Sequence, residues 1–124
     1  MPSKPAKTSK KTVPGMSIYQ IKITLKGSKP AIWRRVLVPG DIPLNFLHHV
    51  IQIAVGWTNS HLHQFIIGTG AATRFLGLRQ NGTEESHIED ESGFTLVGLA
   101  PAPRKKLLYE YDFGDSWLHD ILVE

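Results

Sequence analysis

The sequence contains no cysteine, and this absence removes several kinds of site at once. Without thiols there are no disulfides, no zinc fingers and no cysteine nucleophile, and a reducing compartment such as the cytoplasm is expected. The chain also lacks an apolar run of the roughly 18 residues that a membrane-spanning helix needs. Met1 to Gly15 lack the apolar middle of a secretory signal. We therefore expect a cytoplasmic protein that makes no contact with a membrane.

Three common enzyme signatures are missing as well. The sequence has no phosphate-binding P-loop, no dinucleotide-binding glycine motif and no Gly-x-Ser-x-Gly nucleophile elbow. Gly68-Thr69-Gly70 is not followed by the rest of any such glycine pattern, and it predicts only a turn. These absences leave the chain with no established cofactor.

Basic residues outnumber acidic ones, but the excess lies at the start of the chain. The whole sequence has 14 Lys and Arg against 11 Asp and Glu, for a net charge of +3. Residues 1–16 hold four Lys and no acid, so residues 17–124 carry ten basic and eleven acidic residues and a net charge of −1. We predict that residues 1–16 form a disordered basic tail and that residues 17–124 form one domain. The basic pI is therefore no evidence for a nucleic-acid-binding face on that domain.

Alternation of polar and apolar residues predicts a hairpin and a helix in the first half of the domain. The alternating segments are Ile18–Lys26 and Ile32–Val38. Apolar residues then recur at helical spacing over residues 43–55, with Asp41 as the expected N-cap and Gly56 as the C-terminal glycine. His48 and His49, within this helix, are interpreted as surface residues. The first half therefore predicts a β-hairpin followed by one main helix.

The middle of the chain predicts one strand and a long connection. His61–Ile67 alternates between polar and apolar residues, and Arg74–Leu78 is a candidate for a second, shorter strand. Residues 68–93 are polar and rich in glycine and acid, which favours a mobile or functional loop. Thr95–Leu99 predicts one helical turn.

The chain ends in a predicted hairpin. Leu107–Phe113 and Trp117–Val123 both alternate, and Gly114-Asp115 between them fits a tight turn with glycine first. The main order of elements is then β-β-α-β-β. We expect an α+β fold in which one main helix packs on a face of a mixed sheet, in a β-grasp-like arrangement.

Five segments carry a resemblance to a known family, and they cover roughly residues 17–124. These segments are Ile18–Lys26, Pro30–Val36, Val55–Trp57, Ser60–Phe65 and Tyr109–His119. In this order they resemble the plasmid pRiA4b ORF-3-like family, and the last segment is the most specific. The resemblance implies an α+β domain associated with plasmids and mobile elements, and it implies no assigned reaction. Family members continue through a segment similar to Cys-Pro-Pro-Glu-Asp-Cys-Gly-Gly, so a chain ending at Glu124 is expected to be a shortened member.

Histidines and aspartates suggest one kind of chemistry. His61 and His63 are two residues apart in a predicted strand, so their rings would face the same side. If the hairpin turn lay beside them, His119 with Asp112 or Asp115 would complete a cluster that holds a divalent metal and activates water. One hypothesis is therefore a metal-dependent hydrolase of phosphodiesters, with these histidines as ligands and an aspartate as ligand or base. The alternative is that the same residues serve packing, hydrogen bonding and turn formation.

Aromatic and basic residues suggest a binding surface instead. Trp57, Tyr111 and Trp117 could form a platform that stacks on bases or receives a partner peptide, although large aromatics more often fill a core. Arg34 and Arg35 could clamp a phosphate or carboxylate, unless an aspartate of the hairpin turn holds one of them in a structural ion pair. Of the two hypotheses we favour a non-enzymatic module that binds an unidentified protein or nucleic acid.

Overall fold

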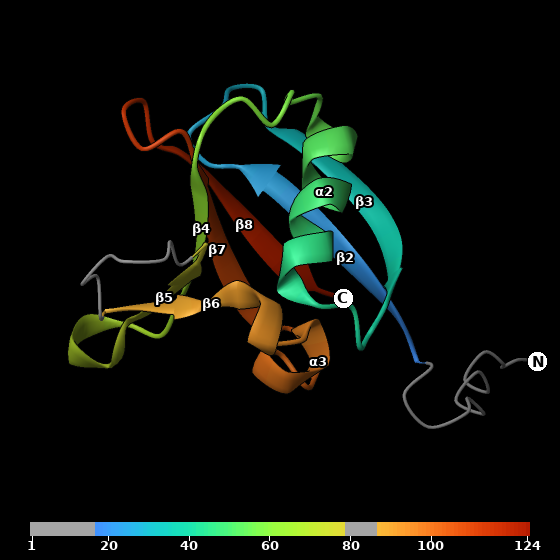
Figure 1. Cartoon of the computed structure of the whole chain (residues 1–124). Helices are drawn as coiled ribbons and strands as arrows, with labels where there is room; N and C mark the ends of the chain where they lie inside the picture. Colours follow the sequence, from blue (N-terminus) through green and yellow to red (C-terminus); the bar gives the residue numbers. More distant parts are fainter. Residues whose placement is uncertain (1–16, 79–86) are drawn as a thin grey trace, which may run out of the picture.

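The computed structural model of the chain describes residues 17–78 and 87–124. The predicted basic tail, residues 1–16, lies outside the described residues. In the described part, one seven-stranded sheet carries the main helix on one of its faces (Figure 1). The prediction of an α+β fold with a helix on a mixed sheet is therefore confirmed. No helix within these two ranges is long and apolar enough to cross a membrane.

The first half of the domain has the elements that alternation and helical spacing predicted. They are β2 (Ile18–Leu25), β3 (Ile32–Pro39) and α2 (Leu44–Val55). The prediction of Asp41 as the helix cap is wrong, because Pro43 occupies the N-cap position and makes no side-chain cap. The backbone N–H of Leu44 donates to the carbonyl of Phe94 instead, so a neighbouring segment satisfies the start of the helix. Gly56 ends the helix with a φ of 87°, which glycine adopts without steric cost.

The second half contains three more short elements than the sequence predicted. Its strands are β4 (His63–Ile67), β5 (Arg74–Gly77), β6 (Ile88–Asp90), β7 (Lys106–Tyr111) and β8 (Trp117–Val123). Its short helices are η1 (Gly70–Ala72), η2 (Glu91–Gly93) and α3 (Leu96–Leu99). The unpredicted elements η1, β6 and η2 fall in the long polar connection, where three-residue elements leave no periodic signal.

The strands lie in the order β3-β2-β8-β7-β4-β5-β6. The pair β5–β6 is parallel and the other five pairs are antiparallel, which makes the sheet mixed. The first and last described strands, β2 and β8, are neighbours in the sheet. This order leaves β3 at one edge of the sheet and places β7 at its centre, with β4 next to β7.

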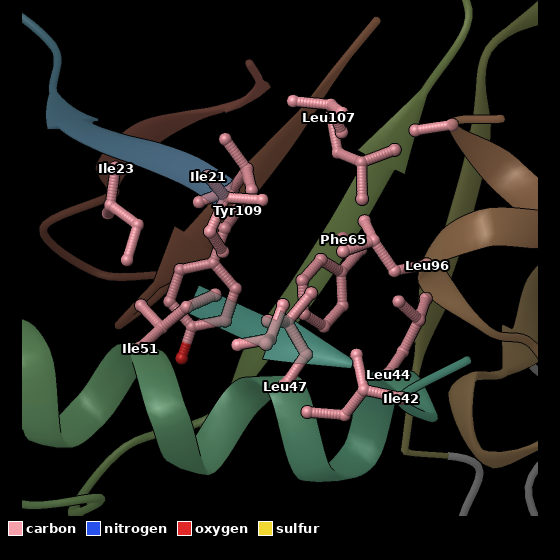
Figure 2. Close-up of a cluster of buried hydrophobic side chains, with 14 of the residues drawn as sticks. Ile21, Ile23, Ile42, Leu44, Leu47, Ile51, Phe65, Leu96, Leu107 and Tyr109 are labelled. Atoms are coloured by element: carbon pink, nitrogen blue, oxygen red, sulfur yellow. The ribbon is translucent and has the colours of Figure 1, made fainter. Parts of the chain in front are cut away.

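The core lies between α2 and the inner face of the sheet. Leu44, Leu47 and Ile51 share one side of the helix and are fully buried against the sheet. Figure 2 shows them facing Phe65 of β4 and Tyr109 of β7. Burial of each such aliphatic side chain contributes about 1.5–3 kcal/mol relative to its exposure. The phenol oxygen of Tyr109 brings a polar group to the helix side of this apolar layer (Figure 2).

Candidate functional site

Two loops meet at one end of the sheet, and both belong to segments that carry the family resemblance. The hydroxyl of Tyr111, at the end of β7, accepts hydrogen bonds from the backbone N–H groups of Ser60 at 2.7 Å and His61 at 3.2 Å. The backbone N–H of Asp112 donates to the carbonyl of Leu62 at 2.8 Å. The loop before β4 is therefore fixed to the turn that follows β7.

The turn between β7 and β8 spans five residues, so the prediction of a tight Gly114-Asp115 turn is wrong. Asp112 leaves the strand with a φ of 66°, and its Oδ1 accepts from the backbone N–H groups of Gly114 and Asp115. Ser116, with a φ of 56°, closes the turn by donating its N–H to the carbonyl of Asp112. Because β7 ends early, Phe113 lies in the turn with an exposed side chain and not on the strand.

A hollow of about 590 Å³ opens between these two loops. It is lined by residues 59–62, by Leu78 and by residues 112–114, and we call it the loop hollow. Three large apolar side chains stand around it, with exposed fractions of 52% for Leu62, 56% for Leu78 and 43% for Phe113. The loop hollow therefore offers apolar surface to solvent at a place where the backbone is held by hydrogen bonds.

A closed ring of hydrogen bonds lies behind the loop that carries Asn59. His48 Nε2–H donates to Asn59 Oδ1 at 2.8 Å, and Tyr109 donates its hydroxyl proton to His48 Nδ1 at 2.6 Å. Gln52 Nε2 donates to the same hydroxyl, and Asn59 N–H donates to Gln52 Oε1. This pattern requires a neutral imidazole, and burial, with His63 nearby, lowers the pKa of His48 to about 4. The interpretation of His48 as a surface residue is wrong, because it is buried.

His119 is held in a second hydrogen-bonded arrangement. Trp57 donates its indole N–H to His119 Nε2 at 3.2 Å, so the ring proton is on Nδ1, which faces the carbonyl of Tyr109 at 3.2 Å. Burial lowers the pKa of His119. The ring centroid of Trp57 lies 5.8 Å from that of Trp117 and 5.1 Å from that of Tyr111. The rings of Trp57, Tyr111 and Trp117 therefore lie together, with Tyr111 buried.

A buried histidine–carboxylate pair is a further polar contact that the sequence did not predict. His63 Nε2 lies 2.8 Å and 3.0 Å from the two carboxylate oxygens of Glu91, which belongs to η2. Both side chains are almost fully buried. The ring of His48 stacks on that of His63, with centroids 3.5 Å apart and planes at 9°. No spacing in the sequence links positions 63 and 91, so nothing in the pattern identifies this pair.

The three histidines of the predicted metal set occupy three separate places. His63 faces Glu91, His119 faces Trp57, and exposed His61 has its Nε2 3.7 Å from Asp112 Oδ2. β4 begins at His63, so His61 lies in the preceding loop and does not alternate with it. Within residues 17–78 and 87–124, no three His, Asp or Glu side chains gather as metal ligands would. Of the predicted set, only His61 and Asp112 come within ion-pair distance.

The predicted arginines lie on β3, and two strands separate them from β7 and its turn. Arg35 forms a bidentate pair with Glu124, with Nε–Oε1 and Nη2–Oε2 distances of 2.6 Å and 2.8 Å. These hydrogen bonds raise the pKa of Arg35 and lower that of Glu124 to about 2. Arg35 is therefore held in a structural ion pair, but its partner is Glu124 and not an aspartate of the turn after β7. Arg34 donates Nη1 to the carbonyl of Trp33.

Replacing Tyr111 with phenylalanine is expected to loosen the loop before β4. The change leaves the N–H groups of Ser60 and His61 without their shared acceptor, at a cost of about 1 kcal/mol. Amide hydrogen exchange should become faster at these two positions and stay unchanged in β2. Equal exchange rates in the variant and the wild type would show that the hydroxyl does not hold the loop.

Comparisons with known proteins agree with the resemblance seen in the sequence. A family model described as plasmid pRiA4b ORF-3-like protein matches residues 17–124. Uncharacterized protein y4hQ of Sinorhizobium fredii (strain NBRC 101917 / NGR234) is 37% identical over 108 residues, which are 87% of this chain and 54% of y4hQ. The crystal structure of MM3350, a protein of unknown function from Methanosarcina mazei Go1, matches with a TM-score of 0.72 at 30% identity.

The match to MM3350 covers 86% of this chain and 58% of MM3350. The chain therefore spans a little over half the length of both y4hQ and MM3350. The matched residues include β3, the loop before β4 and the turn after β7. The matching family model and the 37% identical relative therefore establish that the chain belongs to the plasmid pRiA4b ORF-3-like family.

Proposed function

We propose that the chain is a non-enzymatic protein-interaction module and that the loop hollow receives an apolar side chain of the partner. The observation that carries this proposal is the cluster of exposed Leu62, Leu78 and Phe113 around one concavity. Single exposed apolar residues are ordinary on protein surfaces, but a group of them around a hollow is typical of a binding site.

The rigidity of the loop hollow supports the same proposal. Tyr111 fixes the loop on one side, and Asp112 fixes the turn on the other. Asn59 and Asp112 both have positive φ, and asparagine and aspartate tolerate this conformation better than other non-glycine residues. A partner that binds here orders few residues on this side of the interface, which lowers the entropic cost of association.

The charges around the loop hollow favour a protein partner over a nucleic acid. Its charged or titratable lining residues within the described ranges are His61 and Asp112, with no Lys or Arg. The basic run of residues 104–106 leads into the start of β7, at the opposite end of that strand from the turn. Phosphate backbones require clustered cations, which the described lining residues of this hollow do not offer. We infer a partner segment in which an apolar residue is flanked by Lys or Arg.

The metal-dependent hydrolase remains a sequence prediction without comparable support. It needs His61, His63 and His119 to share one ion, and in the described ranges their Nε2 atoms face three different groups. The interaction module requires only the loop hollow as it stands.

A random peptide library displayed on phage tests the proposal. Peptides selected on the wild-type protein should share an aromatic or leucine residue next to Lys or Arg. Their affinity should fall at least about tenfold in Phe113→Ser and Leu62→Ser, since loss of an apolar anchor removes most of the binding energy of a small site. Ile18→Ser provides the matched control, because Ile18 is equally exposed but lies on β2.

Three results would overturn the proposal. In the first, no peptide is enriched, and in the second, the enriched peptides bind the two serine variants as well as the wild type. In the third, single-stranded oligonucleotides bind in a salt-sensitive way that Phe113→Ser leaves unchanged, and the nucleic-acid alternative then takes its place. All these substitutions alter exposed residues, so the unfolding midpoint of each variant should match that of the wild type.

A further inference from the structure

The main helix α2 carries no charged residue. Its twelve residues have neither an acid in the first turn nor a base in the last, and the polar ones are Asn45, His48, His49 and Gln52. The other eight residues are apolar. A helix on the surface of a protein normally keeps charged and polar residues on its solvent side, whereas a helix that is apolar all round is covered on both sides. The composition of α2 is therefore closer to that of a helix with a layer on each side.

The solvent side of α2 bears an apolar stripe. Phe46, Val50 and Ile53 are four and three residues apart, so they lie on one side of the helix. That side is opposite the one that packs on the sheet (Figure 2). Phe46 is 57% exposed and Ile53 is 82% exposed, and the exposed His49 lies on the same side. We call Phe46, His49, Val50 and Ile53 the helix stripe. Figure 1 shows α2 on the outside of the molecule, with one side toward the strands.

The absence of charge on the helix narrows the kinds of partner that fit it. Helices that lie on a membrane surface carry Lys or Arg beside their apolar side, and α2 has neither. Nucleic acids require clustered cations, which the helix also lacks. A protein recognised by charge would find no opposite charge on α2. The matching surface is therefore apolar and uncharged, and the helix stripe of a second copy of this chain is such a surface.

The spacing within the helix stripe makes it complementary to itself. In a dimer with twofold symmetry the same patch faces itself, so that residue i of one copy contacts residue j of the other and j contacts i. Phe46 and Ile53 lie equally far along the helix on either side of the peptide bond between His49 and Val50. A twofold axis at this bond makes the two helices antiparallel. It then places Phe46 of each copy against Ile53 of the other.

We propose that two copies of the chain form a dimer in which their helix stripes pack antiparallel. A helix of twelve residues is about 18 Å long. The contact between two such helices is smaller than the roughly 800 Å² per partner of a standard stable interface. We therefore expect a reversible dimer with a dissociation constant on the order of 100 µM. The loop hollow contains no residue of α2, so this inference does not depend on the proposed function.

Sedimentation equilibrium of the full chain between about 10 µM and 1 mM tests the inference. The wild type should change from monomer to dimer over this range. Phe46→Lys and Ile53→Glu should each weaken the dimer at least about tenfold, because each places an unpaired charge in an apolar contact. Leu37→Lys is the matched control, since Leu37 is 67% exposed but lies on β3, and this variant should dimerise like the wild type. Phe113→Ser should also leave dimerisation unchanged.

A mixture of the two charged variants tests the antiparallel arrangement. In a mixed antiparallel dimer, the new ammonium of the Phe46→Lys copy lies against the new carboxylate of the Ile53→Glu copy. The other Phe46–Ile53 contact keeps its native residues. An equimolar mixture should therefore dimerise about tenfold more tightly than either variant alone. In a parallel pair of helices the two new charges do not meet, and the mixture gains nothing.

Four results would overturn the inference. They are a wild type that is monomeric at about 1 mM, a dimer that neither charged variant weakens, and a mixture that is no tighter than its components. The fourth is a monomeric wild type that sediments with phosphatidylcholine vesicles and loses this binding in Ile53→Glu, because a membrane then covers the helix stripe. The substituted side chains are exposed, so the unfolding midpoints of all variants should match that of the wild type.

Discussion

Replacing Glu91 with alanine is expected to lower the free energy of unfolding by about 3 kcal/mol. The substitution removes the acceptor that lies 2.8 Å and 3.0 Å from His63 Nε2, in a place that water does not reach. A buried donor without a partner loses its hydration and gains nothing in return, and this loss exceeds the value of an average hydrogen bond. Urea unfolding at pH 7, followed by circular dichroism, measures the change.

Glu91→Gln is the matched variant for this prediction. The amide keeps the shape of the side chain and an oxygen that accepts from His63 Nε2, but it carries no charge. We expect this variant to lose clearly less stability than Glu91→Ala. A control on the exposed pair between Arg74 and Glu89, such as Glu89→Ala, should cost less than about 1 kcal/mol. If Glu91→Ala were as mild as Glu89→Ala, the buried pair would not stabilise the fold.

Local pattern accounts for most of the fold that could be predicted. The strands β2, β3, β7 and β8 all alternate between the inner and outer face, and α2 repeats its apolar residues at helical spacing. Each of these signals arises within one element, since the period reflects which side of that element is buried. The α+β class follows from such signals without any knowledge of how the elements meet.

The parts that were missed depend on contacts between distant residues. His48 lies on the buried side of the helix with Leu44 and Ile51, but it is polar and its partners Asn59 and Tyr109 come from other elements. Glu91 lies in an acidic stretch that is typical of solvent-exposed loops, yet η2 carries it under the helix to His63. Side-chain chemistry alone gives no sign of such a pairing, because charged and polar residues are usually exposed.

Only some residues around the loop hollow were singled out in the sequence, and its shape was not predicted. Tyr111, Asp112 and His61 all come from segments singled out in the sequence, and they do meet. Their roles differ from those predicted, because Asp112 takes a left-handed backbone conformation and ends β7 two residues early. That change moves Phe113 from a strand face into the turn, which creates the apolar rim of the loop hollow. The backbone conformation of one residue thus decides between a packed hairpin and an exposed apolar rim.

Lowering the pH from 7 to 5 is expected to destabilise the fold by about 2 kcal/mol through His48 alone. Its pKa in the folded protein is about 4, against an ordinary value of 6.5 in an unfolded chain. The unfolded state therefore binds more protons between these two values, and stability falls as the pH falls through 6.5 toward 4. The value of pH 5 lies about 1.5 units below the unfolded pKa of 6.5, and each of these units lowers the free energy of unfolding by about 1.4 kcal/mol.

His119 changes stability in the same direction, because burial also lowers its pKa. Protonation of its Nε2 would place a second N–H against the indole N–H of Trp57, so the folded state resists it. The groups near His48 act in both directions, since His63 and His49 lower its pKa while Glu91 and the hydrogen bond to Asn59 raise it. Burial is the largest of these influences and sets the sign.

His48→Gln separates this titration from general acid effects. The variant loses stability at pH 7, because glutamine cannot reproduce both hydrogen bonds to Asn59 and Tyr109. Its further loss between pH 7 and pH 5 should be smaller than that of the wild type by about 2 kcal/mol, since the titrating group is gone. Urea midpoints at the two pH values give both quantities. An equal loss in the variant and the wild type would mean that His48 is not held neutral, and the closed hydrogen-bond ring behind the loop hollow would then be wrong.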